Sequence, residues 1–140
     1  MAMSAVHWAE KQEEPGHTVW PLKLVDRGYD VWMATNRGAT YSDYNKNDGQ
    51  WPDEERWDFS FAEMGMFDQP AFIDKILEVT GEPKITYIGY SAGTTQMLYA
   101  LGSGDWLNDK LRDVILVAPS LFTPGNTYEG IVHTYQGFKD

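Results

Sequence analysis

The pentapeptide GYSAG, residues 89–93, constrains the fold of this chain more than any other segment. Its first glycine is the last residue of the short apolar stretch KITYIG, residues 84–89, which predicts a buried strand. It also opens the segment 91–103, whose apolar residues recur at helical spacing and predict a helix. A bare G-x-S-x-G pattern is common by chance, so this strand-turn-helix setting is what gives it chemical meaning.

The two glycines explain how such a turn can form. Backbone segments on both sides of the serine must pack closely, so we expect Gly89 and Gly93 to remove side chains that would collide there. The turn would raise the Ser91 hydroxyl above the carboxyl edge of the sheet, where open α/β sheets bind ligands. The following helix would direct the Ala92 amide at the same place, as a donor to a developing oxyanion. Ser91 is therefore the candidate catalytic nucleophile, and Tyr90 beside it either approaches a substrate pocket or packs beside the sheet.

The simplest alternative is that Ser91 is a turn serine that caps a helix. The strand before it and the helix after it favour the nucleophile.

Apolar stretches that predict strands alternate with helical patterns along the chain. Strands are predicted at residues 29–36, 84–89 and 114–119. Helical patterns occupy residues 18–28, 59–80 and 91–103. This alternation predicts right-handed crossovers and a parallel sheet. We therefore expect an α/β fold with about three parallel strands and flanking helices.

The central helical pattern carries signals at its ends. Ser60 and Glu63 have the spacing of a capping box. Asp68 can cap a second start, with Pro70 tolerated in the first turn, and Gly81 stops the helix. This region should therefore be helical in two parts.

Charge and composition exclude several functions. The 140 residues carry a net charge of −10, which disfavours a nucleic-acid partner and is compatible with a neutral lipid or ester. The chain has no cysteine, so neither a disulfide nor a thiolate zinc site is expected. Residues 1–14 lack the basic and apolar regions of a secretory signal. No cofactor or metal is implied.

A calcium loop is the nearest approach to a metal motif. Asp43, Asn45, Asn47 and Glu54 almost match its ligand positions, but the glycine falls one place late, at Gly49. An ordinary polar loop is the favoured interpretation. Arg37 is expected to hold the adjoining loop through a carboxylate such as Asp58 or Glu63.

Longer motifs carry a resemblance to a known family. DRGYDVWMATNRG, TYS, RWDFSFAEMGMFDQPAFIDKILEVTG and ITYIGYSAGTT occur in this order. Together they resemble the acid lipases, which include gastric and lysosomal lipases and sterol esterases. The resemblance covers about residues 21–119 and implies an α/β-hydrolase fold that acts on triacylglycerols or cholesteryl esters. It maps Ser91 onto the nucleophile and the Ala92 amide onto half of the oxyanion hole. The family commonly has His and Gln beside the serine; Tyr90 and Ala92 stand there here, which keeps the backbone donor but alters the pocket wall.

The chain departs from the family pattern at both ends. The His-Gly-Leu loop that supplies the second oxyanion amide in the family has no counterpart before Pro21. The family's triad Asp and His lie downstream of a helical cap, and only His133 follows Ser91 here. Asp113 should lie at the opposite edge of the sheet from Ser91. We therefore expect no triad acid or His in this chain, and little turnover by the chain alone.

The expected organisation has three parts: an irregular N-terminus (1–17), a partial α/β-hydrolase core (18–119), and a loop or the start of a missing cap region (120–140). Uncovered sheet edges in such a core would invite self-association. The resembling family is secreted or lysosomal, yet no signal is present, so the compartment stays open.

Two further hypotheses compete with a lipid ester hydrolase. A non-catalytic α/β module would explain the missing triad partners. A nucleotide-binding protein would need a Gly-rich phosphate loop after its first strand, and residues 36–38 do not form one.

Overall fold

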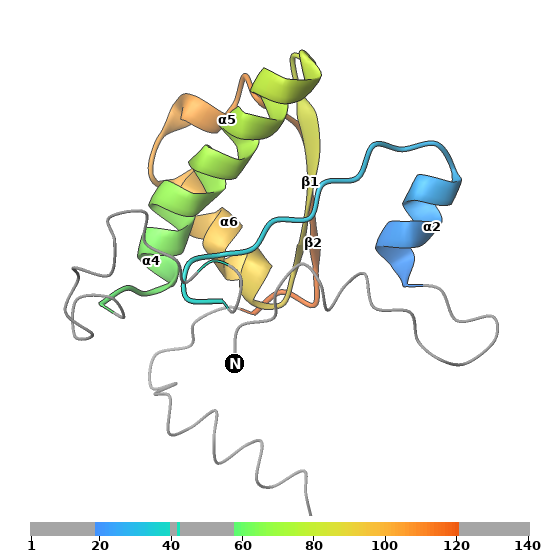
Figure 1. Ribbon diagram of the computed structural model, residues 1–140. Helices are drawn as coiled ribbons and strands as arrows, with labels where there is room; N and C mark the ends of the chain where they lie inside the picture. Colours follow the sequence, from blue (N-terminus) through green and yellow to red (C-terminus); the bar gives the residue numbers. More distant parts are fainter. Residues whose placement is uncertain (1–18, 40–41, 43–57, 121–140) are drawn as a thin grey trace, which may run out of the picture.

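The computed structural model describes residues 19–39, 42 and 58–120. The described elements, in chain order, are helix α2 (Trp20–Asp26), helix α4 (Phe61–Glu63), π-helix η1 (Met64–Asp68), helix α5 (Gln69–Thr80), strand β1 (Ile85–Tyr90), helix α6 (Ala92–Gly102), 3-10 helix η2 (Asp105–Leu107) and strand β2 (Leu111–Val117). Figure 1 shows α4, α5 and α6 on one side of the two strands and α2 on the other. No helix in the described ranges has the length and apolar character needed to cross a membrane.

The two strands pair in parallel, as predicted. Their register runs from Ile85 opposite Leu111 to Tyr90 opposite Val117. Within it Asp113 lies opposite Thr86, near the start of β1. Because Ser91 follows the far end of β1, Asp113 is at the opposite end of the sheet from it, as expected. It belongs to β2, however, because that strand begins at Leu111, earlier than the apolar pattern indicated.

The predicted strand at residues 29–36 is wrong. This segment forms no strand, and the sheet of the described residues has two strands instead of three. Its large side chains are not buried: Tyr29 is 63% exposed and Trp32 is 44% exposed. An apolar, β-branched stretch becomes a strand only where a neighbouring strand completes its hydrogen bonds, and composition does not report that neighbour.

The helical region after residue 59 begins as predicted. The Ser60 hydroxyl accepts a hydrogen bond from the Ala62 amide at 3.1 Å, and the Glu63 carboxylate accepts one from the Ser60 amide at 2.7 Å. This confirms the capping box. The Ser60 hydroxyl also donates to the Glu63 carboxylate, and this bond, together with the one from the Ser60 amide, lowers the pKa of Glu63. Gly81 ends the helix with φ 71°, a left-handed conformation suited to glycine.

The two predicted helical parts are joined by a π-helical segment. Asp68 precedes α5 but makes no side-chain cap. Within the π-helix, Gly65 lies against α6: a Cβ there would be 2.5 Å from the Gln96 carbonyl oxygen and 2.6 Å from the Tyr99 Cβ. Glycine is therefore required for this close approach of η1 and α6.

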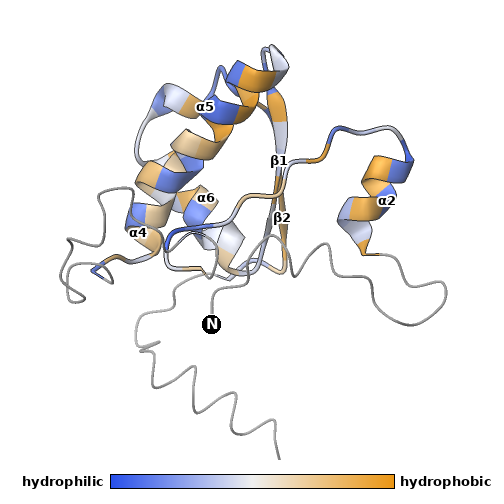
Figure 2. Cartoon of the chain, viewed as in Figure 1, coloured by the Kyte–Doolittle hydropathy of each residue, from blue (hydrophilic) through white to orange (hydrophobic). Residues whose placement is uncertain are grey.

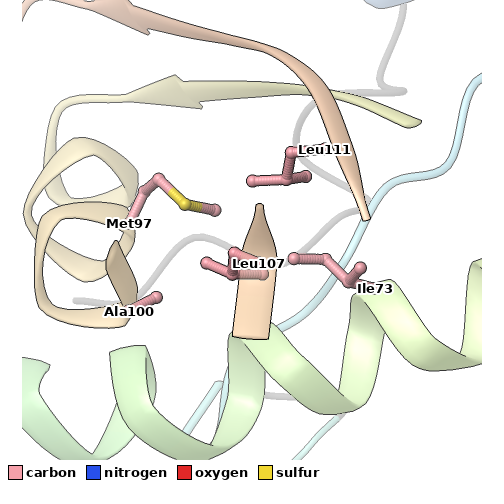
Figure 3. Close-up of a cluster of buried hydrophobic side chains, with 5 residues drawn as sticks. All are labelled: Ile73, Met97, Ala100, Leu107 and Leu111. Atoms are coloured by element: carbon pink, nitrogen blue, oxygen red, sulfur yellow. The ribbon is translucent and has the colours of Figure 1, made fainter. Parts of the chain in front are cut away.

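The core lies between α5, α6 and the sheet. Figure 3 shows Ile73, Met97, Ala100, Leu107 and Leu111 directed toward one another, and all are at most 9% exposed. In Figure 2, hydrophilic and hydrophobic residues mix along α5, as in a helix that covers a core with one side only. Ile73 of α5 and Met97 of α6 are among the largest fully buried side chains of this core.

The expectations for residues 1–17, for the loop that contains Asp43, and for residues 121–140 lie outside the described residues. The division into three parts stays a prediction.

Candidate active site

Ser91 occupies a sharp turn between β1 and α6. Its backbone has φ 49° and ψ −113°, which a residue with a side chain rarely adopts. Its amide donates to the Val117 carbonyl at 3.0 Å, so the turn is attached to the end of β2. The side chain is exposed. The strand, tight turn and helix predicted for residues 84–103 are confirmed, whereas the catalytic role of Ser91 stays a prediction.

The two glycines of the turn differ in their steric roles. A Cβ on Gly89 would lie 2.8 Å from Tyr87 Cε1 and 3.0 Å from the backbone carbon and oxygen of Gly93. Real Cβ atoms essentially never show the first distance, and the other two are tighter than ordinary contacts, so the predicted collision is confirmed at Gly89. Among the described residues, a Cβ on Gly93 would meet only the Tyr87 hydroxyl, at 3.5 Å, an ordinary contact. Within the described part of the chain the predicted collision is therefore not found at Gly93, whose backbone atoms are instead what a side chain on Gly89 would meet.

Tyr87 connects the strand to the helix across this turn. Its hydroxyl donates to the Gly93 carbonyl at 2.9 Å. Burial raises the pKa of Tyr87 to about 12, because the charged phenolate would lose its hydration. A phenol with a raised pKa is a poor proton acceptor at neutral pH, and we therefore assign Tyr87 a structural role.

Two threonines at the start of α6 bind backbone groups around the turn. The Thr94 hydroxyl donates to the Ser91 carbonyl at 2.6 Å and accepts from the Ser120 amide at 3.0 Å. The Thr95 hydroxyl donates to the Ser120 carbonyl. The sequence analysis missed these contacts. The tendency of Thr near a helix start to bind backbone was the available signal, but it does not identify a partner 25 residues away.

Ala92 is the first residue of α6. Amides in the first turn of a helix have no partner within that helix, and the helix dipole makes that end partly positive. The Ala92 amide is therefore a candidate donor to an anion beside Ser91, and its role in an oxyanion hole stays a prediction. Tyr90, on the other side of Ser91, is 46% exposed, so it is not fully packed beside the sheet.

An ion pair holds the loop after residue 36. The Arg37 guanidinium lies 2.6 Å from the carboxylate of Asp68, which also accepts from the Arg37 amide at 3.1 Å. The guanidinium also lies over the rings of Phe59 and Phe67, at 5.9 and 5.8 Å.

A carboxylate was expected to hold Arg37, and this is confirmed, but the carboxylate is Asp68 and not one of the two examples, Asp58 and Glu63. Glu63 is engaged by Ser60 instead. Asp68 is only 8% exposed, and a buried carboxylate needs a counterion, but the linear spacing of charges does not rank candidate partners.

A buried amide pair links the same region to α6. Gln69 Nε2 donates to Gln96 Oε1 at 2.8 Å, and the two residues are 4% and 2% exposed. Gln96 Nε2 in turn donates to the Met64 sulfur at 3.2 Å. The helix that carries Ser91 at its start is thus held by polar contacts as well as by the apolar core.

The described residues around Ser91 include no hydrogen-bonded general base. Among the described residues no side chain hydrogen-bonds to the Ser91 hydroxyl. His7, His17 and His133 all fall outside the described ranges. Within those ranges no cluster of three or more acidic or histidine side chains could hold a metal. The described residues provide the hydroxyl of the exposed Ser91 and, next to it in the chain, the backbone amide of Ala92.

Comparison with known proteins identifies the class. The family model of the alpha/beta hydrolase fold matches residues 15–140, and the chain belongs to this family. The chain is similar to a probable lipase of Schizosaccharomyces pombe, 45% identical over 106 residues, which are 75% of this chain and 24% of that protein. It is 44% identical to the gastric triacylglycerol lipase of Mus musculus over 97 residues, 69% of this chain and 24% of that protein. It is 43% identical to lipase member M of Homo sapiens over 96 residues, 69% and 22% of the two chains.

These similarities confirm the resemblance to acid lipases. The chain spans about a quarter of the length of these curated relatives. No solved structure matches the chain.

Proposed function

We propose that this chain carries the nucleophile of a serine ester hydrolase that acts on neutral lipid esters. The observation that carries the proposal is the conformation of Ser91, strained at φ 49° and exposed between a parallel strand and a helix start. Strained backbone clusters at functional sites, because only a surrounding structure that over-determines it keeps it in place. A serine that merely capped a helix would have an extended backbone and a side chain bonded to the first turn. Ser91 has neither of these features.

In the proposed reaction, the Ser91 hydroxyl attacks the ester carbonyl as its proton passes to a base. The carbonyl oxygen becomes an oxyanion, which the Ala92 amide stabilises. Collapse of this intermediate releases the alcohol and leaves an acyl group on Ser91, which water then removes as the carboxylic acid. The base and its orienting acid must come from outside the described residues.

The substrate class follows from the relatives and from charge. One relative is named a triacylglycerol lipase, and other relatives are named lipases. The net charge of −10 is compatible with an uncharged ester and unfavourable for a phosphate-rich partner. We therefore propose a neutral lipid ester and no nucleic-acid partner.

A fluorophosphonate probe tests the nucleophile directly, since it reacts covalently with activated serines. We expect mass spectrometry of the labelled protein to place the adduct on Ser91. Ser91→Ala should abolish labelling. Ser103→Ala, which changes an exposed serine at the other end of α6, should leave it unchanged. Equal labelling of wild type and Ser91→Ala would contradict the proposal.

A non-catalytic module is the second candidate, and one observation favours it: the Ser91 hydroxyl has no hydrogen-bonded base among the described residues. A serine hydroxyl without a base reacts slowly, so we expect weak turnover from this chain alone. Hydrolysis of a short-chain nitrophenyl ester separates the two candidates. Turnover that disappears in Ser91→Ala would refute the non-catalytic module.

A further inference from the structure

We propose that Thr94 and Thr95 are positioning residues for Ser91: they clamp the first turn of α6 to the residues that follow β2 and so hold the strained turn in place. The effect on catalysis rests on the proposed function of Ser91. The effect on the geometry of the turn does not, and the two can be measured separately.

The clamp joins two strained positions. Ser91 and Ala118 are the non-glycine residues with positive φ in the described part of the chain, each at 49°. Tyr90 and Val117 form the last pair of the β1-β2 register, so Ser91 and Ala118 leave the sheet together. The Ser91 amide bonds to the Val117 carbonyl, which ties the first of these turns to the strand that leads into the second.

The threonine hydroxyls complete the connection. The Thr94 hydroxyl donates a hydrogen bond to the Ser91 carbonyl at 2.6 Å and accepts one from the Ser120 amide at 3.0 Å. The Thr95 hydroxyl donates a hydrogen bond to the Ser120 carbonyl. Both backbone polar groups of Ser120 are thus bound by the first turn of α6. Ser91, one of the two strained residues, and Ser120, two positions after the other, are joined through the Thr94 side chain.

Burial makes these bonds important. Thr94 is 0% exposed and Thr95 is 5% exposed, so water does not readily replace a lost partner. A hydroxyl both donates and accepts, and serine retains this ability whereas valine lacks it. Valine also preserves the shape of threonine. Thr94→Val therefore removes the clamp with little change in packing volume, and Thr94→Ser restores it.

The threonines act through the backbone. Their hydroxyls hydrogen-bond to the Ser91 carbonyl and the Ser120 backbone, and among the described residues neither has a hydrogen bond to Ser91 Oγ. A strained turn persists only where its surroundings over-determine it. Loss of the clamp should let Ser91 relax toward ordinary φ values, which would move its hydroxyl without removing it.

Hydrogen exchange on the whole chain tests the geometry without any catalysis. The readout is the exchange rate of the Ser91 amide divided by that of the Ile85 amide, which bonds to Lys110 at the other end of β1. We expect Thr94→Val to raise this ratio about ten-fold, as loss of a buried hydrogen bond would. Thr94→Ser should restore it, and Thr95→Val should raise the exchange of the Ser91 amide less than Thr94→Val does.

Thr80→Val is the matched control, because the Thr80 hydroxyl also donates to a backbone carbonyl, that of Ile76, and accepts from a backbone amide, that of Glu82. It lies at the end of α5, away from the turn, and should leave the ratio unchanged. A ratio in Thr94→Val equal to that of wild type, or one raised equally by Thr80→Val, would overturn the proposal. Dividing by Ile85 cancels a general loss of stability, so a poorly stable variant still gives a result.

Fluorophosphonate labelling then measures the catalytic consequence. In Thr94→Val we expect a lower maximal labelling rate with an unchanged half-saturating probe concentration, since the nucleophile is displaced while binding is intact. Recovery in Thr94→Ser separates positioning from general destabilisation. If wild type itself is not labelled at Ser91, the proposed function fails, while the exchange ratio still decides whether the clamp exists.

Discussion

The hydroxyl of Tyr87, on β1, donates a 2.9 Å hydrogen bond to the backbone carbonyl of Gly93, in the first turn of α6. The bond spans the turn that presents Ser91, so strand and helix are held together on the inner side of the bend. The hydroxyl is buried enough for its pKa to rise to about 12. It therefore stays protonated, and able to donate, well beyond neutral pH.

We predict that Tyr87→Phe lowers the free energy of unfolding by about 1 kcal/mol near neutral pH, the typical net value of one hydrogen bond. Urea denaturation followed by tryptophan fluorescence measures this change. A variant as stable as wild type would show that the bond does not contribute.

The unfolding free energies of wild type and Tyr87→Phe should also depend differently on pH. The pKa of Tyr87 is raised from 10 to about 12 in the folded state, so above pH 10 the unfolded chain loses this proton first. The stabilisation is thus complete below pH 10 and is lost as the pH rises toward 12. The stability difference between wild type and Tyr87→Phe should shrink across this window. A difference that stays constant above pH 10 would contradict the assignment to Tyr87.

Gly89→Ala should destabilise the protein by roughly 2 kcal/mol, the usual cost of forcing extra volume into a packed site. The new methyl group would lie 3.0 Å from Gly93 backbone atoms, which cannot rotate away. Among the described residues, the methyl group of Gly93→Ala meets one ordinary contact, at 3.5 Å, and the change gains helix propensity, so it should be neutral or stabilising by up to about 1 kcal/mol. Thermal denaturation compares the two, and equal losses would refute the steric distinction.

Ser91→Gly should stabilise the fold by about 1 kcal/mol, because glycine adopts a positive φ without strain. Ala118→Gly should act in the same direction, since it has the same φ of 49°. Ala71→Gly, in the exposed interior of α5, is the control and should cost about 1 kcal/mol. Chemical denaturation of the three variants measures the signs. A destabilised Ser91→Gly would mean that the turn stores no strain.

Asp68→Asn should lower stability by about 2 kcal/mol, because it removes the charge that compensates the half-buried guanidinium of Arg37. The matched control is Asp74→Asn, which breaks the more exposed pair with Lys110 and should cost less than about 1 kcal/mol. Salt titration of the unfolding midpoint adds a second comparison, as the exposed pair is more strongly screened. Equal costs would show that burial of Asp68 is unimportant.

The buried amide pair should behave as a unit. Gln69→Met or Gln96→Met alone leaves one amide without its partner and should cost about 2 kcal/mol. The double variant should cost less than the sum of the two, because no unpaired amide then remains in this pair. A double-mutant cycle of unfolding free energies measures this coupling. Strict additivity would show that the 2.8 Å bond carries no coupling energy.

Much of the local structure followed from short stretches of sequence. The capping box at Ser60 and the left-handed Gly81 depend on contacts within a few residues, so their patterns were sufficient. The bend at Ser91 also depends on neighbours in sequence, above all on the absence of a side chain at Gly89. The fold class followed from the alternation of helical and strand patterns.

Other features depend on which segments meet in space. Residues 29–36 have the composition of a strand but do not form one, because a strand needs a neighbouring strand to complete its hydrogen bonds as well as suitable side chains. Arg37 pairs with Asp68 instead of the two carboxylates first considered, and the burial of Asp68 arises only when η1 packs in place.

The sequence alone determined the strand-turn-helix unit around Ser91, because a tight turn is governed by sterics within a few residues. Only the tertiary structure decided that Thr94 and Thr95 bind the backbone of Ser120 and that Gln69 meets Gln96. Hydrogen-bonding side chains accept many partners of similar energy, and their choice is made by the packing of elements far apart in the chain.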